Sequence, residues 1–232
     1  MRHRILIATL FTLISGALMP AAEPPAIDNE LWFFIQQDTQ QAMARLQFQE
    51  GFEKLLAGLP AGTPVRVILF RGTDYNVLWS GAAETAPRPM PGLVFGVANA
   101  ATTPYKNLLR LLRTESVKNR TIVFISNGVS QDMLILKDDS GFFRMEANSF
   151  TPNRYPPLDQ VVRYCRDNEI RLLGFFVGLN PPARGDLSDI SFSMFRYVVE
   201  EAKGKSFYNY NSFPGVFDTV LKQGLLTGPW KH

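Results

Sequence analysis

Polar residues that can bind ligands follow the predicted buried strands of this 232-residue chain. Asp38 comes soon after the apolar run 31–35, Thr103 precedes a proline at the start of a predicted helix, and Asn127 follows the apolar run 121–126. Their carboxylate, hydroxyl and amide oxygens can hold a hard cation such as Mg²⁺ or hydrogen-bond a partner directly. Either use requires the three side chains to converge.

Histidine is almost absent, and this excludes several kinds of catalysis. The two histidines are His3, near the start, and His232, the last residue. Ser-His-Asp triads, Cys-His pairs and histidine-ligated zinc all need an imidazole inside the folded domain. Carboxylates, hydroxyls and amides are therefore the groups left for any chemistry.

Apolar runs that read as strands alternate with segments that have helical spacing. Alternation of this kind is typical of a parallel sheet with helices on both faces, so we expect a three-layer, doubly wound, mostly parallel α/β domain. In such folds ligands gather at the carboxyl ends of the strands. The predicted strands are 31–35, 65–70, 76–79, 121–126, 170–177 and 206–210, and the predicted helices are 42–59, 158–168, 192–202, 214–223 and one that begins at 104.

The first 22 residues read as a secretory signal peptide. They have a basic start, an apolar run at 5–19 and two small residues, Ala21 and Ala22. A membrane anchor is the alternative, but the run is shorter than the roughly 20 residues that a bilayer requires. We therefore expect a secreted or periplasmic protein, cleaved near Ala22, with residues 23–232 as one domain and no membrane span after leader removal.

Charge and cysteine content limit the partners. The formal net charge is +3, and two of the arginines lie in the predicted leader, so the remaining charge is close to balanced and does not favour nucleic acid. The single cysteine, Cys165, excludes an internal disulfide and lies on an apolar helical face. We interpret it as buried packing rather than as a reactive thiol.

Several segments, taken in order, resemble a known family. Residues 38–43 resemble an Asp-x-Ser-x-Ser-Met turn, residues 103–109 a helix that begins at a threonine, and residues 121–128 a strand that ends in Asp-Gly. This ordered set, which extends over about residues 30–225, is similar to the von Willebrand factor type A domain. The resemblance implies the α/β fold expected above and a role in binding proteins.

The resemblance also implies a position for a metal site. In that family, strand-end residues form a metal-ion-dependent adhesion site, in which Mg²⁺ leaves a position open for a partner's carboxylate. Carried over, Asp38 keeps the first carboxylate, whereas Gln40 and Ala42 replace two serines. Thr103 matches the family's threonine, and Asn127 stands in place of the last aspartate.

A second register is possible, in which Gln36, Asp38 and Gln40 occupy the first three ligand positions. Neither register restores the complete set, and Mg²⁺ needs carboxylates or phosphates to offset the loss of its water. We therefore expect a degenerate site and no bound cofactor. Asp38 and Thr103 also suit the start of a helix, where their side chains would cap backbone N–H groups.

These features predict an exported, non-catalytic protein-interaction module that uses the strand-end face. A hairpin predicted around 138–141 would add apolar anchors beside it. The alternatives are an Mg²⁺-dependent adhesion domain completed by Asp132 or Asp186, a carboxylate-based exported hydrolase, and a component of an envelope assembly. The predicted binding residues are Asp38, Gln40, Thr103, Asn127, Phe142 and Phe143.

A run of basic residues stands apart from this site. Its residues are Lys106, Arg110, Arg113, Lys118 and Arg120, with one acid, Glu115, among them. We interpret the run as a basic helical face in contact with solvent, and attraction of an acidic partner is the alternative.

Overall fold

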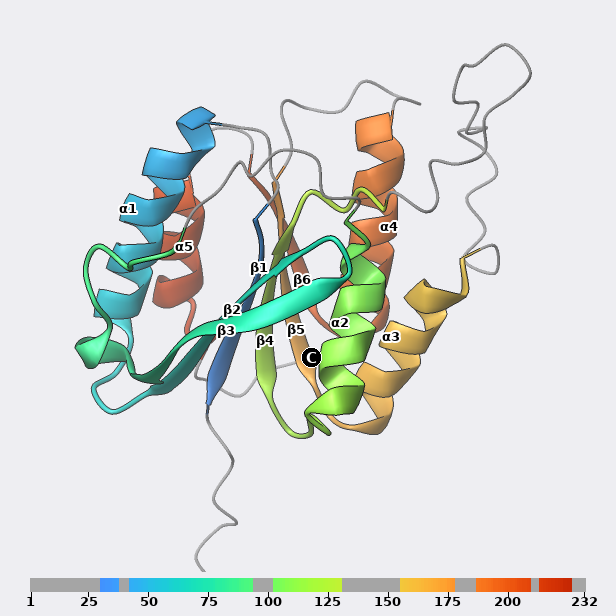
Figure 1. Ribbon diagram of the computed structural model, residues 1–232, viewed down its shortest axis with the longest axis horizontal. Coiled ribbons are helices and arrows are strands. Elements are labelled where there is room, and N and C mark those ends of the chain that lie inside the picture. Colours follow the sequence, from blue (N-terminus) through green and yellow to red (C-terminus); the bar gives the residue numbers. More distant parts are fainter. Residues whose placement is uncertain are drawn as a thin grey trace, which may run out of the picture.

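A six-stranded sheet forms the centre of this computed structural model, which describes residues 30–37, 42–93, 102–130, 155–177, 187–209 and 213–226 (Figure 1). The strands are β1 (Leu31–Gln36), β2 (Pro64–Arg71), β3 (Asp74–Ala82), β4 (Thr121–Ser126), β5 (Arg171–Val177) and β6 (Lys205–Asn209). Their order is β3-β2-β1-β4-β5-β6. All neighbours are parallel except β2 and β3. The carboxyl ends of five strands therefore meet at one edge.

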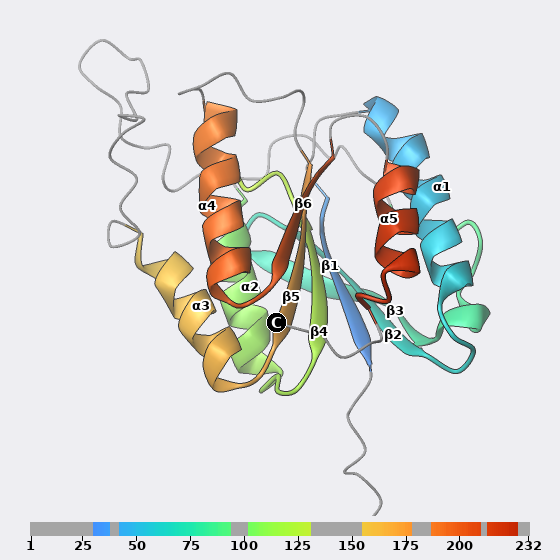
Figure 2. The same cartoon turned by 180° about the vertical axis from the view of Figure 1, so that it is seen from behind.

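Helices cover both faces of this sheet. They are α1 (Ala42–Gly58), α2 (Pro104–Thr114), α3 (Pro156–Asp167), α4 (Leu187–Glu201) and α5 (Phe213–Lys222), with a short 3₁₀ turn η1 at Ala83–Thr85. Helices α1 and α5 pack on one face, and α2, α3 and α4 pack on the other (Figures 1 and 2). The predicted three-layer, mostly parallel α/β arrangement is confirmed. Within the described ranges, no helix is both long and apolar enough to cross a bilayer.

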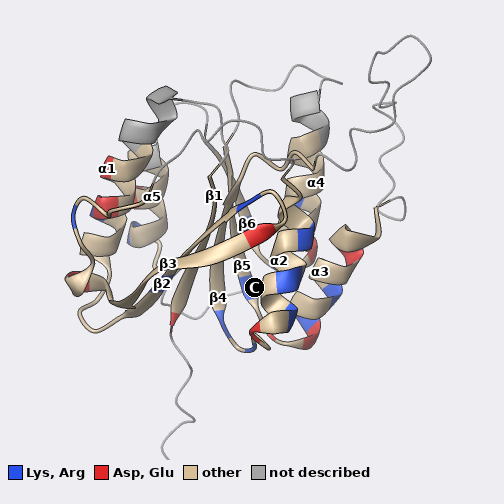
Figure 3. Cartoon of the chain, viewed as in Figure 1, with Lys and Arg blue, Asp and Glu red and all other residues tan. Residues whose placement is uncertain are grey.

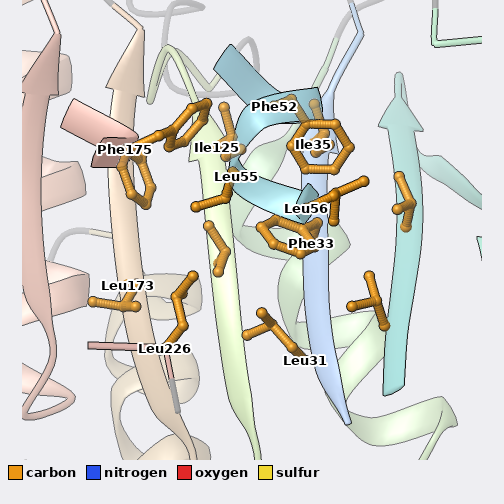
Figure 4. Packing of buried hydrophobic residues seen from close by; sticks show 14 of the residues in the cluster. Leu31, Phe33, Ile35, Phe52, Leu55, Leu56, Ile125, Leu173, Phe175 and Leu226 are labelled. Carbon is orange, nitrogen blue, oxygen red and sulfur yellow. The ribbon is translucent and has the colours of Figure 1, made fainter. Parts of the chain in front are cut away.

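Strand β1 lies at the centre of the sheet, and its continuous apolar run fits burial on both faces. Phe33 and Ile35 point toward α1, where they meet Phe52 and Leu55 (Figure 4). The ring of Phe33 lies 4.9 Å from that of Phe52 in an edge-to-face arrangement. Phe34 belongs to the core on the opposite face. The packing on both sides holds the end of β1 at a fixed place on the carboxyl edge.

The edge strand β3 is longer than the predicted 76–79. It pairs with β2 through a tight turn at Gly72, whose φ of 55° lies in the left-handed region that glycine adopts without strain. A β-bulge interrupts the pairing between Val67 and Ile68. Most of β3 is exposed or half-buried, so its apolar pattern is too weak to reveal the full strand.

Charged residues gather at the opposite, amino edge of the sheet. The guanidinium carbons of Arg66 and Arg120 lie 4.6 and 4.7 Å from the centre of the Trp32 ring. Glu30 accepts hydrogen bonds from Trp32 Nε1, at 2.6 Å, and from Arg120. Arg66 also pairs with Glu115, at 3.3 Å.

This amino-edge cluster corrects the predicted basic helical face. Helix α2 ends at Thr114, so Lys118 and Arg120 lie beyond it. Arg120 is partly buried against Trp32 and is not part of an exposed face. The basic face on α2 therefore consists of Lys106, Arg110 and Arg113 alone.

Cys165 is fully buried and free, as predicted. Its surroundings on α3 are apolar, and burial raises the pKa of its thiol to about 12. A thiol in this state holds its proton and reacts slowly. The interpretation as packing is confirmed.

Candidate functional site

The end of β1 contacts the end of β4 through buried polar side chains. Gln36 is the last residue of β1 and is only 2% exposed. Its Oε1 accepts a hydrogen bond from Ser126 Oγ, at 2.6 Å, and another from the backbone N–H of Asn127, at 3.2 Å. Both lone pairs of this amide oxygen are therefore used within the protein. We refer to Gln36, Ser126 and Asn127 as the carboxyl-edge cluster.

The turn after β4 holds this cluster in place. The N–H of Gly128 donates to Ser126 Oγ at 2.9 Å, and the N–H of Val129 donates to Asn127 Oδ1 at 3.0 Å. Gly128 has a φ of 66°, and a Cβ at this position would lie 2.7 Å from the backbone oxygen of Ser191. Only glycine fits both the conformation and the space. The Asn127–Gly128 pair is a turn, and that turn also orients the Asn127 side chain.

The start of α2 attaches to the β2–β3 turn. Thr102 Oγ1 accepts from the N–H of Gly72 at 2.7 Å, and the Gly72 oxygen accepts from the N–H of Thr103, at 3.1 Å, and from Asn107 Nδ2, at 2.8 Å. These bonds fix the α2 N-terminus at the carboxyl edge. Because Thr102 and Asn107 are buried, the attachment is rigid.

Thr103 does stand at the N-cap position of α2, but its side chain does not cap the helix. The expected hydrogen bond to the helix backbone is absent, and the hydroxyl, although buried, has no hydrogen-bond partner among the described residues. Thr103 contributes instead through its backbone oxygen, which accepts from the N–H of Asn107 at 2.9 Å. The prediction that the Thr103 side chain caps the helix was therefore wrong, and its buried hydroxyl is a polar group that makes no hydrogen bond among the described residues.

Tyr105 connects α2 to the turn after β4. Its hydroxyl donates to the backbone oxygen of Gly128 at 3.1 Å. Burial raises the pKa of Tyr105 well above its ordinary value, with a smaller contribution from Tyr155. Tyr155 in turn shares a hydrogen bond with Ser130 at 2.9 Å. The surroundings of the carboxyl-edge cluster are therefore neutral as well as buried.

The described residues at this edge offer neutral oxygen atoms only, and most of these oxygens are already hydrogen-bonded. Gln36 Oε1 and Asn127 Oδ1 already accept hydrogen bonds, and the Ser126 hydroxyl both donates and accepts. The described residues at the ends of β1 and β4 supply amides and hydroxyls but no carboxylate. Across the described ranges, no group of three or more His, Cys, Asp or Glu side chains could hold a metal ion. Mg²⁺ in proteins depends on carboxylates or phosphates.

Two of the predicted binding residues can be placed in the structure. Thr103 and Asn127 lie at the carboxyl edge, each attached by the backbone contacts given above. The remaining predicted residues, including the two acids of the alternative metal site, lie outside the described residues: Asp38, Gln40, Asp132, Phe142, Phe143 and Asp186.

Sequence reasoning gave Gln36 a role only in the second register, and it overlooked Ser126, Thr102 and Asn107. The signal for Ser126 was a polar residue at the end of an otherwise apolar strand. The contact between Gln36 and Ser126 brings the end of β1 beside the end of β4, and Asp38, with which the other register begins, lies outside the described residues. No comparable signal distinguished Thr102 from its neighbour Thr103, because both are threonines in one short loop.

Comparison with known proteins identifies the fold. No family model matches this sequence, and no curated protein matches it either. Solved structures do match. The conserved hypothetical protein BatB from Bacteroides thetaiotaomicron aligns with a TM-score of 0.55 and 12% identity over 84% of this chain and 97% of its own.

Two longer proteins match over part of their length. A von Willebrand factor type A protein from Catenulispora acidiphila aligns with a TM-score of 0.51 and 12% identity over 85% of this chain and 42% of its own. The open conformation of the pilus adhesin SpaC from Lactobacillus rhamnosus GG aligns with a TM-score of 0.56 and 11% identity over 84% of this chain and 29% of its own. The chain thus spans less than half of these two proteins. With the sheet order described above, it has the fold of von Willebrand factor type A domains.

Proposed function

We propose that this chain is an exported, non-catalytic binding module that holds a protein partner at the carboxyl edge of its sheet without a resident metal ion. The observation that carries the proposal is the hydrogen bond from Ser126 to Gln36. In the register that begins at Gln36, this neutral pair stands where the family's metal site begins. An amide that is buried and doubly hydrogen-bonded is a structural support rather than a metal ligand.

The choice of partner class rests on the fold and on the chemistry of this edge. One protein of the same fold is a pilus adhesin, and protein recognition is the use that we extend to this chain. Asn127 and Val129 are half-buried and lie on a turn held by three hydrogen bonds. A rigid, neutral turn can present backbone and amide groups to a partner with little loss of entropy on binding.

A non-catalytic role is supported by the environment of the hydroxyl that could act as a nucleophile. Ser126 donates its proton to an amide oxygen, which is not a base. The hydrolase alternative therefore depends on Asp38, outside the described residues. A phosphatase and glycosidase screen of the purified protein should give no turnover, and turnover that is lost in Asp38→Asn would contradict the proposal.

The metal part of the proposal is tested by calorimetric titration with MgCl₂ and MnCl₂ after treatment with EDTA. We expect no saturable heat at micromolar metal concentrations, because the edge offers neutral oxygens. Asp38→Ala is the matched variant. Tight binding that this variant abolishes would favour the Mg²⁺-dependent adhesion domain instead.

The partner part is tested with a photo-crosslinking amino acid placed at Val129, in the turn after β4, in chain exposed to envelope extract containing EDTA. The control places the same amino acid at Gln223, an exposed residue just after α5. We expect a crosslinked protein from position 129 only. A product that needs added Mg²⁺, or one that forms equally from position 223, would contradict binding at this edge.

Export is the remaining part of the proposal. It rests on the basic start and apolar run of residues 1–22. Mass spectrometry of the intact protein purified from cells should give the mass expected for the chain without residues 1–22. A mass that retains residues 1–22 would show that the leader is not cleaved.

A further inference from the structure

A groove lies between α2 and α3, away from the carboxyl-edge cluster. Its volume is about 420 Å³, within the range of ligand-binding clefts. The lining combines a buried leucine and a half-buried proline with polar and basic side chains. The lining residues are Lys106, Leu109, Arg110, Arg113, Thr114, Pro157 and Gln160.

Three cations form one stripe along this groove. Lys106, Arg110 and Arg113 are spaced four and three residues apart, so they lie on one face of α2. All three are exposed, and Figure 3 shows basic residues gathered on α2. Like charges at this spacing destabilise a helix slightly. The stripe therefore has an energetic cost that an anionic ligand would remove.

Acidic side chains near the groove offset only part of this charge. Arg110 pairs with Asp74 at 2.8 Å, and that pair is well exposed. Arg113 takes part in none of the ion pairs among the described residues. On α3, Asp159 accepts a hydrogen bond from Tyr197 of α4 at 2.7 Å and is not among the lining residues. The lining itself contains no carboxylate, and the excess positive charge of the groove rests on Arg113.

The arrangement of the cations indicates what kind of anion fits. Lys106 and Arg113 are seven residues apart, which is about 10 Å along the helix axis. Successive carboxylates of an extended peptide can follow a stripe of this length and contact all three cations. The lining has no aromatic ring on which a nucleic-acid base could stack. Leu109 and Pro157 offer a surface to an apolar side chain instead.

We propose that the groove between α2 and α3 binds an acidic peptide segment of a protein partner. Carboxylates of that segment pair with Lys106, Arg110 and Arg113, and an apolar side chain packs against Leu109 and Pro157. This contact is separate from the strand-end site, so either one can exist without the other.

The test uses a fluorescent peptide of alternating glutamate and leucine, whose binding to the mature chain is followed by anisotropy. Arg113→Glu should weaken binding by roughly tenfold, because an attractive contact becomes repulsive. Lys54→Glu is the control, since Lys54 lies on α1, across the sheet, is 66% exposed and carries the same charge. It should change affinity by less than about twofold.

A second variant tests the groove without changing its charge. Thr114→Trp places a bulky ring in the groove from the exposed end of α2 and should also abolish most binding, while circular dichroism confirms the fold. A peptide with glutamine in place of glutamate should not bind. Unchanged affinity in Thr114→Trp, equal loss in Lys54→Glu, or displacement of the peptide by an equimolar thymidine oligonucleotide or by inorganic phosphate would each overturn the proposal.

Discussion

At the amino edge of the sheet, the guanidinium groups of Arg66 and Arg120 lie over the Trp32 ring, and Glu30 accepts hydrogen bonds from the indole and from Arg120. At the carboxyl edge, the same strand ends in Gln36, which accepts hydrogen bonds from the Ser126 side chain and the next backbone N–H. One edge of the sheet is held by compensated charges and the other by neutral groups.

The comparison shows that the two edges bury polar groups in different ways. Charges at the amino edge are tolerated because Arg66 and Arg120 each pair with an acid and lie over the Trp32 ring. The carboxyl edge is where ligands gather in folds of this kind, and the hydrogen bonds of its cluster form between neutral groups. Opposite changes of charge should therefore lower stability at the two edges. Removal of a charge should destabilise the amino edge, and addition of a charge should destabilise the carboxyl edge.

The largest expected effect is at the amino edge. Glu30→Gln keeps the shape of the side chain but removes the negative charge between two arginines. Because these groups are partly buried, the free energy of unfolding should fall by about 2–3 kcal/mol. Urea unfolding measures this, with Glu50→Gln, in an exposed pair with Lys54, as the control. Equal effects of the two substitutions would remove the distinction between this cluster and an ordinary surface pair.

The converse change at the carboxyl edge should be slightly milder. Gln36→Glu preserves the acceptor for Ser126 but adds a buried charge, which should lower the free energy of unfolding by about 2 kcal/mol at pH 7. Burial raises the pKa of the introduced carboxyl, so the loss should shrink as the pH falls toward 5 and the group gains a proton. Gln223→Glu, on the surface, is the control. A pH-independent loss would indicate disturbed packing rather than charge.

Cys165 extends the comparison to a neutral group buried within α3. Burial raises the pKa of its thiol to about 12, whereas the unfolded thiol ionises near its ordinary value of 9. Between these values the folded state holds more protons, so stability falls as the pH rises above 9. At pH 10 the contribution should be about 1.4 kcal/mol relative to pH 8. Urea unfolding measures the free energy of unfolding at pH 8 and at pH 10, and Cys165→Ala should lack the fall that the thiol causes. An equal fall in both proteins would mean that other groups cause it.

The sheet was predictable from sequence because its inner strands are apolar without interruption. In β1 and β4, burial on both faces demands such runs. Strand β3 was predicted too short because an edge strand leaves residues exposed, Val77 among them. Hydrophobic pattern therefore carries information about the centre of a sheet and much less about its margin.

The site was less predictable, since it depends on shifts of one or two residues. Whether Gln36 or Asp38 begins the motif depends on where β1 ends, and neighbouring glutamines make both registers plausible from sequence. Thr103 could be placed at the start of α2, but its residue type does not reveal that Thr102 takes the hydrogen bond with Gly72. Such choices are set by tertiary contacts.

The sheet order has a consequence for how the chain matures. Gln36 bonds to Ser126, a residue 90 positions later, so the central strand is synthesised long before its β4 partner. Pairing over such a separation slows folding, because the intervening loop must close first. If the chain is exported before it folds, as we propose from residues 1–22, slow strand pairing is an advantage, because an unfolded chain can still be translocated.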